Sequence, residues 1–361
     1  MKHWQETAAS LSEVARLTEA GKRAAVATVI RIRGSAYRRP GAKLLVREDG
    51  TTSGSVSGGC LEADVREVAL TVMRDGRPRL LHYDTSSDDR VVFGLGLGCN
   101  GAVDIFVQLA STPAFARSAG RISELLGGDE AFSVTTVLGG DAAGRTLVVA
   151  ADGAPSGSTG DPALDEKVAR RAAELMRRGE AAVHETDALQ LFTEVLTPPP
   201  RLVVFGAGDD ALPLARYAQD VGFRVAVVDH RPAALSDGQF PDEIRRFTLR
   251  PEQGVSTLPL GPRTFAVVKT HSLGLDREWV RKLLRTEVPY IGVLGPRARI
   301  EEILRQVEAA RDGRVFGPVG LDVGTDGPEQ VAVSVVAELL AVKAGRAGRH
   351  LRDREGPIHA P

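Results

Sequence analysis

The two cysteines of the chain, Cys60 and Cys99, both lie in glycine-rich segments, SVSGGCLEADV and VVFGLGLGCNG. Cys60 follows Gly58 and Gly59, and an amphipathic pattern behind it predicts a helix from about Leu61. A cysteine at a helix start favours its thiolate form, because the helix dipole is positive there. Both thiols are therefore candidate ligands for a metal or another soft centre. The alternative is that each is a small, inert packing residue.

The loop before Leu61 also has the features of an anion site. Gly58 and Gly59 allow the backbone to approach a ligand closely, and the free N–H groups of the predicted helix point toward the loop. Arg38 and Lys43 are cations that lie nearby in the sequence. This combination predicts an anionic ligand, such as a phosphate, held beside a thiolate.

A second glycine turn, VVFGAGDDA, places Gly206 and Gly208 between a predicted strand and a predicted helix. Asp229 ends the next strand, about 20 residues further on, where dinucleotide-binding folds hold a ribose hydroxyl. Asp209 and Asp210 suit the helix dipole but would repel a pyrophosphate. A nucleotide site and a purely structural Rossmann domain therefore both remain open.

Two further segments end predicted strands at the edge where open α/β sheets bind ligands. KTH places Lys269 and His271 there, and GPRAR places Arg297 there. His271 is a candidate ligand contact or a loop residue, and Arg297 is a candidate phosphate contact or a solvated charge. An NAD(P)-dependent oxidoreductase is the alternative function, with His271 or Lys269 as its proton donor.

The elements that position these residues divide at a run of three prolines, 198–200. We predict an N-terminal α/β domain over residues 1–196, a Rossmann-like domain over 201–345 and a polar tail over 346–361. Apolar strands alternate with helical patterns in the second domain, which predicts a doubly wound parallel sheet.

The first domain contains an internal repeat. Residues 41–76 and 144–179 align without gaps at an offset of about 103 residues. Each copy predicts a strand, a DG turn, an SGS segment and an amphipathic helix. The copies differ at the Cys60 loop and at the basic segment RGSAYRRPG, for which the second copy has only LGGDAAG. The first copy is therefore predicted to carry the chemistry of this domain.

Composition excludes several classes of protein. The chain has 361 residues and a formal net charge of −1, so it has no basic field for nucleic acid. Its apolar runs are too short to span a membrane, and two distant cysteines make no disulfide framework. We expect a reduced, cytoplasmic protein. Motifs of zinc hydrolases, serine hydrolases and P-loop ATPases are absent from the sequence.

The chain resembles the xanthine dehydrogenase accessory proteins of the XdhC/CoxI type. The resemblance rests on GSAYRRPGAKLLV, GSVSGGCLEADV and GLGLGCNGAVDIF in the first domain, and on VVFGAG, THSLGLD, YIGVLGPRAR and GPVGLDVGTDG in the second. It implies a cofactor chaperone rather than an enzyme with its own turnover.

Such a chaperone binds molybdenum cofactor, as molybdopterin or its dinucleotide form. It supports sulfuration of that cofactor, with a cysteine desulfurase as partner, and delivers it to a xanthine dehydrogenase-type molybdoenzyme. The resemblance also implies that Cys60 and Cys99 contact the cofactor or its sulfur, that Gly58 and Gly59 shape the loop, and that Arg38 meets the cofactor phosphate. A homodimer is a further expectation.

Overall fold

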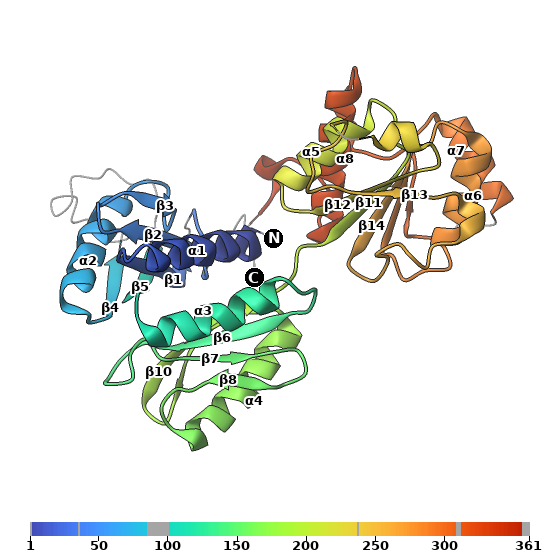
Figure 1. Cartoon of the computed structure of the whole chain (residues 1–361). Helices are drawn as coiled ribbons and strands as arrows, with labels where there is room; N and C mark the ends of the chain where they lie inside the picture. Colours follow the sequence, from blue (N-terminus) through green and yellow to red (C-terminus); the bar gives the residue numbers. More distant parts are fainter. Residues whose placement is uncertain (1, 35–36, 85–100, 237, 308–311, 356–361) are drawn as a thin grey trace. The chain divides into compact units, whose positions relative to one another are not determined.

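The computed structural model describes residues 2–34, 37–84, 101–236, 238–307 and 312–355. These residues form two compact units, which meet in the sequence between Pro198 and Pro199 (Figure 1). We call them the N-terminal unit and the C-terminal unit and describe each by itself.

The N-terminal unit contains two antiparallel five-stranded sheets with the same strand order, β3-β2-β1-β5-β4 and β8-β7-β6-β10-β9. The first sheet comprises β1 (Ala24–Gly34), β2 (Lys43–Arg47), β3 (Thr52–Gly54), β4 (Arg79–Asp84) and β5 (Gly101–Leu109). The second comprises β6 (Phe132–Val137), β7 (Thr146–Val149), β8 (Pro155–Gly157), β9 (Ala182–Thr186) and β10 (Leu189–Leu196). Its helices are α1 (Lys2–Glu19), α2 (Glu62–Asp75), α3 (Pro113–Leu126) and α4 (Pro162–Arg178).

Each sheet has a helix on one face and an apolar layer on the other. Val65, Ala69 and Val72 of α2 pack on the first sheet, and α4 covers the second sheet in the same way. On the other faces, α1 and α3 share a core in which Trp4 packs edge-to-face on Phe132. The alternation of side chains along the strands requires both layers, since each strand has apolar residues pointing to either side.

The register of the strands shows which residues of the two halves are equivalent. Val26 pairs with Leu45 and Gln108, whereas Val134 pairs with Val148 and Glu194. Gln108 and Glu194 therefore hold the same position in the two sheets. By the same alignment, Lys43 of the first sheet corresponds to Thr146 of the second.

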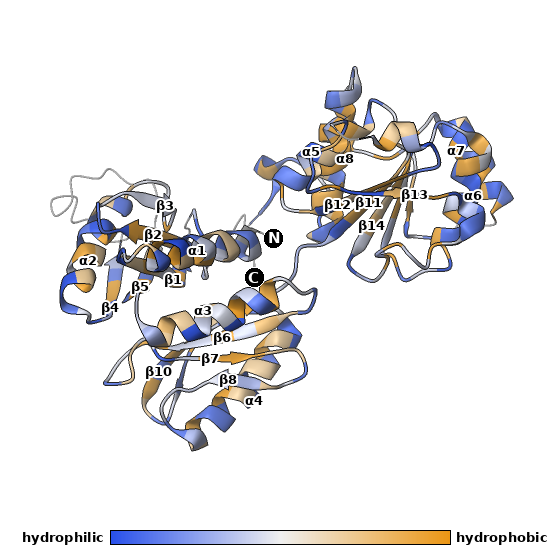
Figure 2. Cartoon of the chain, in the orientation of Figure 1, coloured by the Kyte–Doolittle hydropathy of each residue, from blue (hydrophilic) through white to orange (hydrophobic). Residues whose placement is uncertain are grey.

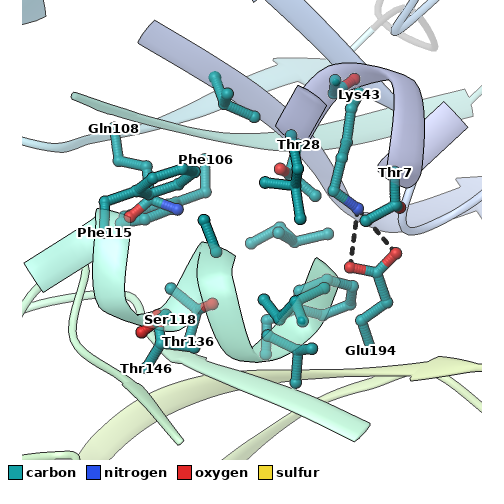
Figure 3. Close-up of a pocket in the computed structure, with 18 of the residues that line it drawn as sticks. Thr7, Thr28, Lys43, Phe106, Gln108, Phe115, Ser118, Thr136, Thr146 and Glu194 are labelled. Atoms are coloured by element: carbon teal, nitrogen blue, oxygen red, sulfur yellow. Dashed lines mark hydrogen bonds and ion pairs between the residues drawn. The ribbon is translucent and has the colours of Figure 1, made fainter. Parts of the chain in front are cut away.

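A small cavity lies where the two halves meet, and residues from equivalent positions line it (Figure 3). At one end the ammonium of Lys43 bonds both carboxylate oxygens of Glu194, at 2.7 and 2.8 Å (Figure 3). The equivalent residues Thr146 and Gln108 line the cavity as well. One end of this interface is therefore ionic and the other is neutral.

The C-terminal unit is a six-stranded parallel sheet in the order β13-β12-β11-β14-β15-β16. Its strands are β11 (Arg201–Phe205), β12 (Arg224–Asp229), β13 (Arg245–Thr248), β14 (Thr264–Val268), β15 (Tyr290–Val293) and β16 (Val315–Phe316). Its α-helices are α5 (Ala211–Asp220), α6 (Leu273–Leu283), α7 (Arg297–Gln306) and α8 (Pro328–Lys343), and short 3-10 helices span Pro232–Leu235, Pro251–Gln253 and Leu351–Asp353.

Helices cover both faces of this sheet. The core on one face joins α5 and α8 to the strands, and the core on the other joins α6 and α7 to them. Figure 2 shows the central strands as largely hydrophobic, which is expected of strands buried on both faces. The predicted α/β class and the doubly wound parallel sheet are confirmed. Among the described residues, no helix combines the length and apolarity needed to span a bilayer.

Candidate functional site

The Cys60 loop connects β3 to α2 in the first half of the N-terminal unit. The predicted helix start is confirmed to within one residue, because Leu61 precedes the first helical residue, Glu62. Cys60 is half-buried against the core under α2, and its Sγ lies 3.6 Å from the hydroxyl of Ser57. Gly59 has no atom of a described residue within 4 Å of the point where a Cβ would be, apart from its own chain neighbours. A ligand can therefore approach the backbone at Gly59 beside a thiol that is not sealed in the core.

A carboxylate of the chain itself occupies much of the expected anion site. Glu62 Oε1 accepts hydrogen bonds from Ser55 Oγ at 2.9 Å, Ser57 N at 2.9 Å and Val56 N at 3.2 Å. Burial raises the pKa of the Glu62 carboxyl, but the hydrogen bonds from Ser57 and Ser55 outweigh it, so that the pKa is lowered. Glu62 is therefore a fixed negative charge within the loop.

The hydroxyl of Ser57 accepts two further amides of the loop. The N–H groups of Gly59 and Leu61 each donate to Ser57 Oγ at 3.1 Å. The N–H groups of Gly58 and Cys60 donate to no described residue. Of the loop amides between Val56 and Leu61, these two are therefore left for an external anion.

The second half of the unit contains the same carboxylate arrangement. Asp165, which corresponds to Glu62, accepts from Ser158 Oγ at 2.6 Å, Thr159 N at 2.7 Å and Thr159 Oγ1 at 2.6 Å. Since this half has no cysteine there, the arrangement stabilises the loop rather than a ligand. Our sequence reasoning missed Glu62 and Ser57. The signal that could have identified Glu62 is that the second copy of the repeat also has an acidic residue, Asp165, at the equivalent position.

The structure does not bring the predicted cations to Cys60. Lys43 is adjacent to Leu44, which faces α2, so the Lys43 side chain points to the opposite face, where it bonds Glu194. Arg38 is mostly buried and forms an ion pair with Glu6 of α1. The segment before β2 instead brings an aromatic ring to the loop.

That ring belongs to Tyr37. It lies 3.7 Å from the point where Gly58 would carry a Cβ, and it is 77% exposed. Our sequence reasoning did not single out Tyr37. An exposed aromatic face beside an open glycine backbone is a surface on which a planar ring can stack.

Cys99 lies outside the described residues, so its predicted role beside Cys60 stays a prediction. Within the described part of the chain, no three His, Cys, Asp or Glu side chains gather as a metal site would require. Cys60 alone would supply a thiolate ligand there.

The glycine turn of the C-terminal unit follows β11 at the point where the strand order reverses. Gly206 has φ +113, and a Cβ there would lie 2.4 Å from the carbonyl oxygen of Lys269, so only glycine fits. Asp229 is 4% exposed and accepts from Ala207 N at 2.8 Å and Arg231 N at 2.9 Å. One of its oxygens therefore holds the glycine turn and the other holds the segment after β12, rather than being left for a ribose.

Burial raises the pKa of Asp229, but hydrogen bonds from Arg231 and the Ala207 amide have the larger, opposite effect, so that the pKa falls to about 2. The guanidinium of Arg231 reaches both carboxylate oxygens, at 3.0 Å each. Asp229 is thus ionised at every ordinary pH and serves as an anchor between β12 and the turn.

Three polar side chains gather at the same edge. Lys269 is 3% exposed, and its ammonium bonds Asp210 at the start of α5. Burial lowers the pKa of Lys269, an effect that Asp210 opposes. His271 lies with its Nε2 3.2 Å from Asp210 Oδ2, and its φ of +61 is a left-handed conformation that costs a non-glycine residue energy. The structure thus brings His271 beside the Gly208 turn.

Arg297 does not belong to this cluster, since its side chain is exposed on α7. Arg299, two residues later, reaches the edge instead. Its guanidinium pairs with Asp276 at 2.5 Å, and Asp276 also accepts from Thr270 N at 2.9 Å. Asp276 is fully buried, so this network fixes the segment that carries His271.

Residues 17–84 match the XdhC and CoxI family, and residues 202–339 match the XdhC Rossmann domain. A Bacillus subtilis protein, described as a probable subunit of xanthine dehydrogenase, is 32% identical over 327 residues, covering 91% of this chain and 95% of the relative.

Two other relatives extend the comparison. The molybdenum cofactor insertion chaperone PaoD of Escherichia coli is 42% identical over 85 residues, which are 24% of this chain and 26% of PaoD. A solved Bacillus halodurans structure, described as a xanthine dehydrogenase, is 29% identical with a TM-score of 0.75, covering 95% of this chain and 98% of that one. The glycine loop at Cys60, the Rossmann turn at Gly206 and these full-length relatives together show that the chain belongs to the XdhC and CoxI family.

Proposed function

We propose that this protein binds molybdenum cofactor at the Cys60 loop and delivers it to a xanthine dehydrogenase-type molybdoenzyme. The observation that carries the proposal is the half-exposed thiol of Cys60 beside the open backbone at Gly59. The relative PaoD supports it, since that protein is named as a molybdenum cofactor insertion chaperone.

The residues of the loop fit such a ligand in three respects. Cys60 offers a thiolate to a soft metal centre. The free N–H groups of Gly58 and Cys60 suit an oxyanion, and the ring of Tyr37 offers a stacking face to a planar heterocycle. Molybdenum cofactor combines these groups, and when bound it supplies the redox chemistry of the client enzyme.

The cavity between the two halves is not an alternative location. Its volume is about 60 Å³, whereas sites for organic ligands span about 300–1,000 Å³. A surface loop also suits a carrier, because a cofactor held at the surface can pass to a partner without unfolding of the protein.

The proposed role involves two partners, one for sulfuration of the cofactor and one that receives it. We propose that a cysteine desulfurase supplies the terminal sulfur of the cofactor while it is held at the loop, and that the client molybdoenzyme then receives the cofactor. Cys99 is proposed as a second contact to the cofactor or its sulfur.

The test is binding and transfer with purified protein. Molybdenum cofactor released from a donor enzyme is mixed with the wild type and with Cys60→Ser, and bound molybdenum is measured after gel filtration. We expect stoichiometric retention by the wild type and loss in the variant, together with loss of cofactor transfer to a molybdenum-free client enzyme. Equal retention by both proteins would remove Cys60 from the site.

A second candidate function is NAD(P)-dependent oxidation or reduction at the Rossmann edge. The Asp210, Lys269 and His271 cluster favours it, because His271 can exchange a proton there. The ionised Asp210 beside Gly208 opposes a pyrophosphate at that turn. Saturable NAD(P) binding that is lost in Gly206→Val would support this function.

A further inference from the structure

The second half of the N-terminal unit carries a hollow between α3, the turn before β7, and β8, which we call the α3–β8 pocket. Its volume is about 560 Å³. The polar side chains that line it are Arg117, Ser118, Arg145, Thr146, Ser156 and Ser158. Among the described residues that line it, none is acidic.

The two arginines lack a counter-charge. Neither guanidinium forms a hydrogen bond or ion pair within the described part of the chain. Arg145 is exposed and extends along the backbone of Gly160, with its Nη1 2.2 Å from the point where Gly160 would carry a Cβ. Arg117 approaches the pocket from a separate element, α3. Two cations from different elements that converge on an acid-free hollow create a positive potential there.

The carboxylate that bonds Ser158 at the rim of the pocket, Asp165, forms no ion pair with either arginine among the described residues. Asp165 accepts hydrogen bonds from Ser158 Oγ, Thr159 N and Thr159 Oγ1. Ser158 Oγ also accepts from Gly160 N, so its hydrogen-bonding capacity is used within the loop. The hydroxyls of Ser118 and Ser156 have no partner among the described residues, and they remain as donors beside the arginines.

The first half of the unit shows that the fold can neutralise cations in the equivalent region. There, Lys43 is paired with Glu194, and Arg38 is paired with Glu6. The pseudo-symmetric counterparts of Lys43 and Glu194 are Thr146 of the second half and Gln108 of the first. The end of the interface beside the α3–β8 pocket therefore has no carboxylate at the position that Glu194 holds at the other end.

We propose that the α3–β8 pocket binds the phosphoryl group of a small organic phosphate, a monoester or a diphosphate. Arg117 and Arg145 supply charge-assisted hydrogen bonds, which are the strongest that a phosphate receives from a protein. The volume of 560 Å³ leaves room for an organic group beyond the phosphate. This site is distinct from the Cys60 loop and does not rest on the function proposed for that loop.

The experiment is calorimetric titration of the full-length chain with pyrophosphate and, separately, with AMP, at constant low ionic strength. We expect saturable binding of at least one probe. Arg117→Gln and Arg145→Gln should each weaken it about tenfold, and the double variant should abolish it. Arg145→Lys should fall between, because an ammonium keeps the charge but lacks the planar fork.

The matched control is Arg170→Gln on α4. Arg170 is 69% exposed in its side chain, and the carboxylate of Glu166 is 4.0 Å away. This variant changes the net charge equally and should bind the probes as the wild type does. Cys60→Ser should also leave phosphate binding unchanged, which separates this site from the cofactor loop.

Three results would overturn the proposal. They are absence of saturable binding of both probes, undiminished binding in the Arg117→Gln, Arg145→Gln double variant, and an equal loss in Arg170→Gln. Tighter binding of AMP identifies a monoester as the ligand class, and tighter binding of pyrophosphate identifies a diphosphate; either supports the site.

Discussion

The ion pair between Lys43 and Glu194 joins the two halves of the N-terminal unit, and its removal should cost much of that unit's stability. The side chains are 11% and 8% exposed, so each charge depends on the other for solvation. Removal of one member of a buried pair costs about 3–5 kcal/mol. Glu194→Gln should lie at the low end, about 3 kcal/mol, because the ammonium retains the carbonyl oxygen of Gly41 at 3.0 Å.

The pseudo-symmetry of the unit provides the matched double variant. Lys43→Thr with Glu194→Gln reproduces the neutral residues, Thr146 and Gln108, that occupy the equivalent positions. Because no unpaired charge remains, the double variant should cost less than the sum of the two single variants. A coupling free energy of about 1–3 kcal/mol is expected.

The assay is urea unfolding at pH 7, followed by the fluorescence of Trp4. The chain has two tryptophans, so a Trp279→Phe background confines the signal to Trp4, which packs on Phe132 in the N-terminal unit. For a unit of this size, each kcal/mol lost lowers the melting temperature by roughly 2–4 °C, so a loss of about 3 kcal/mol should lower it by roughly 6–12 °C. Single variants that cost under about 1 kcal/mol, or strictly additive variants, would refute the reasoning.

Three further predictions concern the C-terminal unit. Asp229 has its pKa depressed to about 2, so its stabilisation of about 2 kcal/mol is complete above pH 4 and is lost as the pH falls toward 2; the difference in unfolding free energy between wild type and Asp229→Asn should shrink over that window. His271→Gly should raise the free energy of unfolding of the unit by about 1 kcal/mol, because glycine adopts a positive φ without strain. An unchanged or lower free energy of unfolding would argue against strain at this position. Gly206→Ala should destabilise the unit by about 2 kcal/mol or more, because its Cβ meets the Lys269 carbonyl, whereas Gly345→Ala, at a positive φ with no described atom nearby, should cost about 1 kcal/mol in the same denaturant titration.

Most features of the Cys60 loop could be predicted from residues that are close together in the sequence. The glycines, the helix start and the half-exposed cysteine all follow from residues that are close together in the sequence. The capture of loop donors by Glu62 is equally local, and the equivalent Asp165 would have revealed it. What the local pattern did not reveal is the position of Tyr37, since that depends on how the segment before β2 returns over the loop.

The Rossmann edge shows the same division. Strand and helix periodicity predicted the doubly wound sheet, and chain order placed Gly206, Asp229 and His271 at its carboxyl edge. The roles at that edge depend on side-chain competition that spacing does not describe. Asp229 anchors the turn, and Arg299 rather than Arg297 reaches inward, because a buried Asp276 requires a cation.

By itself, then, the sequence determined the class of fold, the repeat pattern and the two glycine loops, because each depends on periodicities and backbone preferences within a few residues. Only the tertiary structure decided which charged side chains pair with each other. Lys43 meets Glu194 across 151 residues of chain, on the face of the sheet away from Cys60. That partnership depends on strand register and on which face each side chain takes, and a shift of one residue would reverse it.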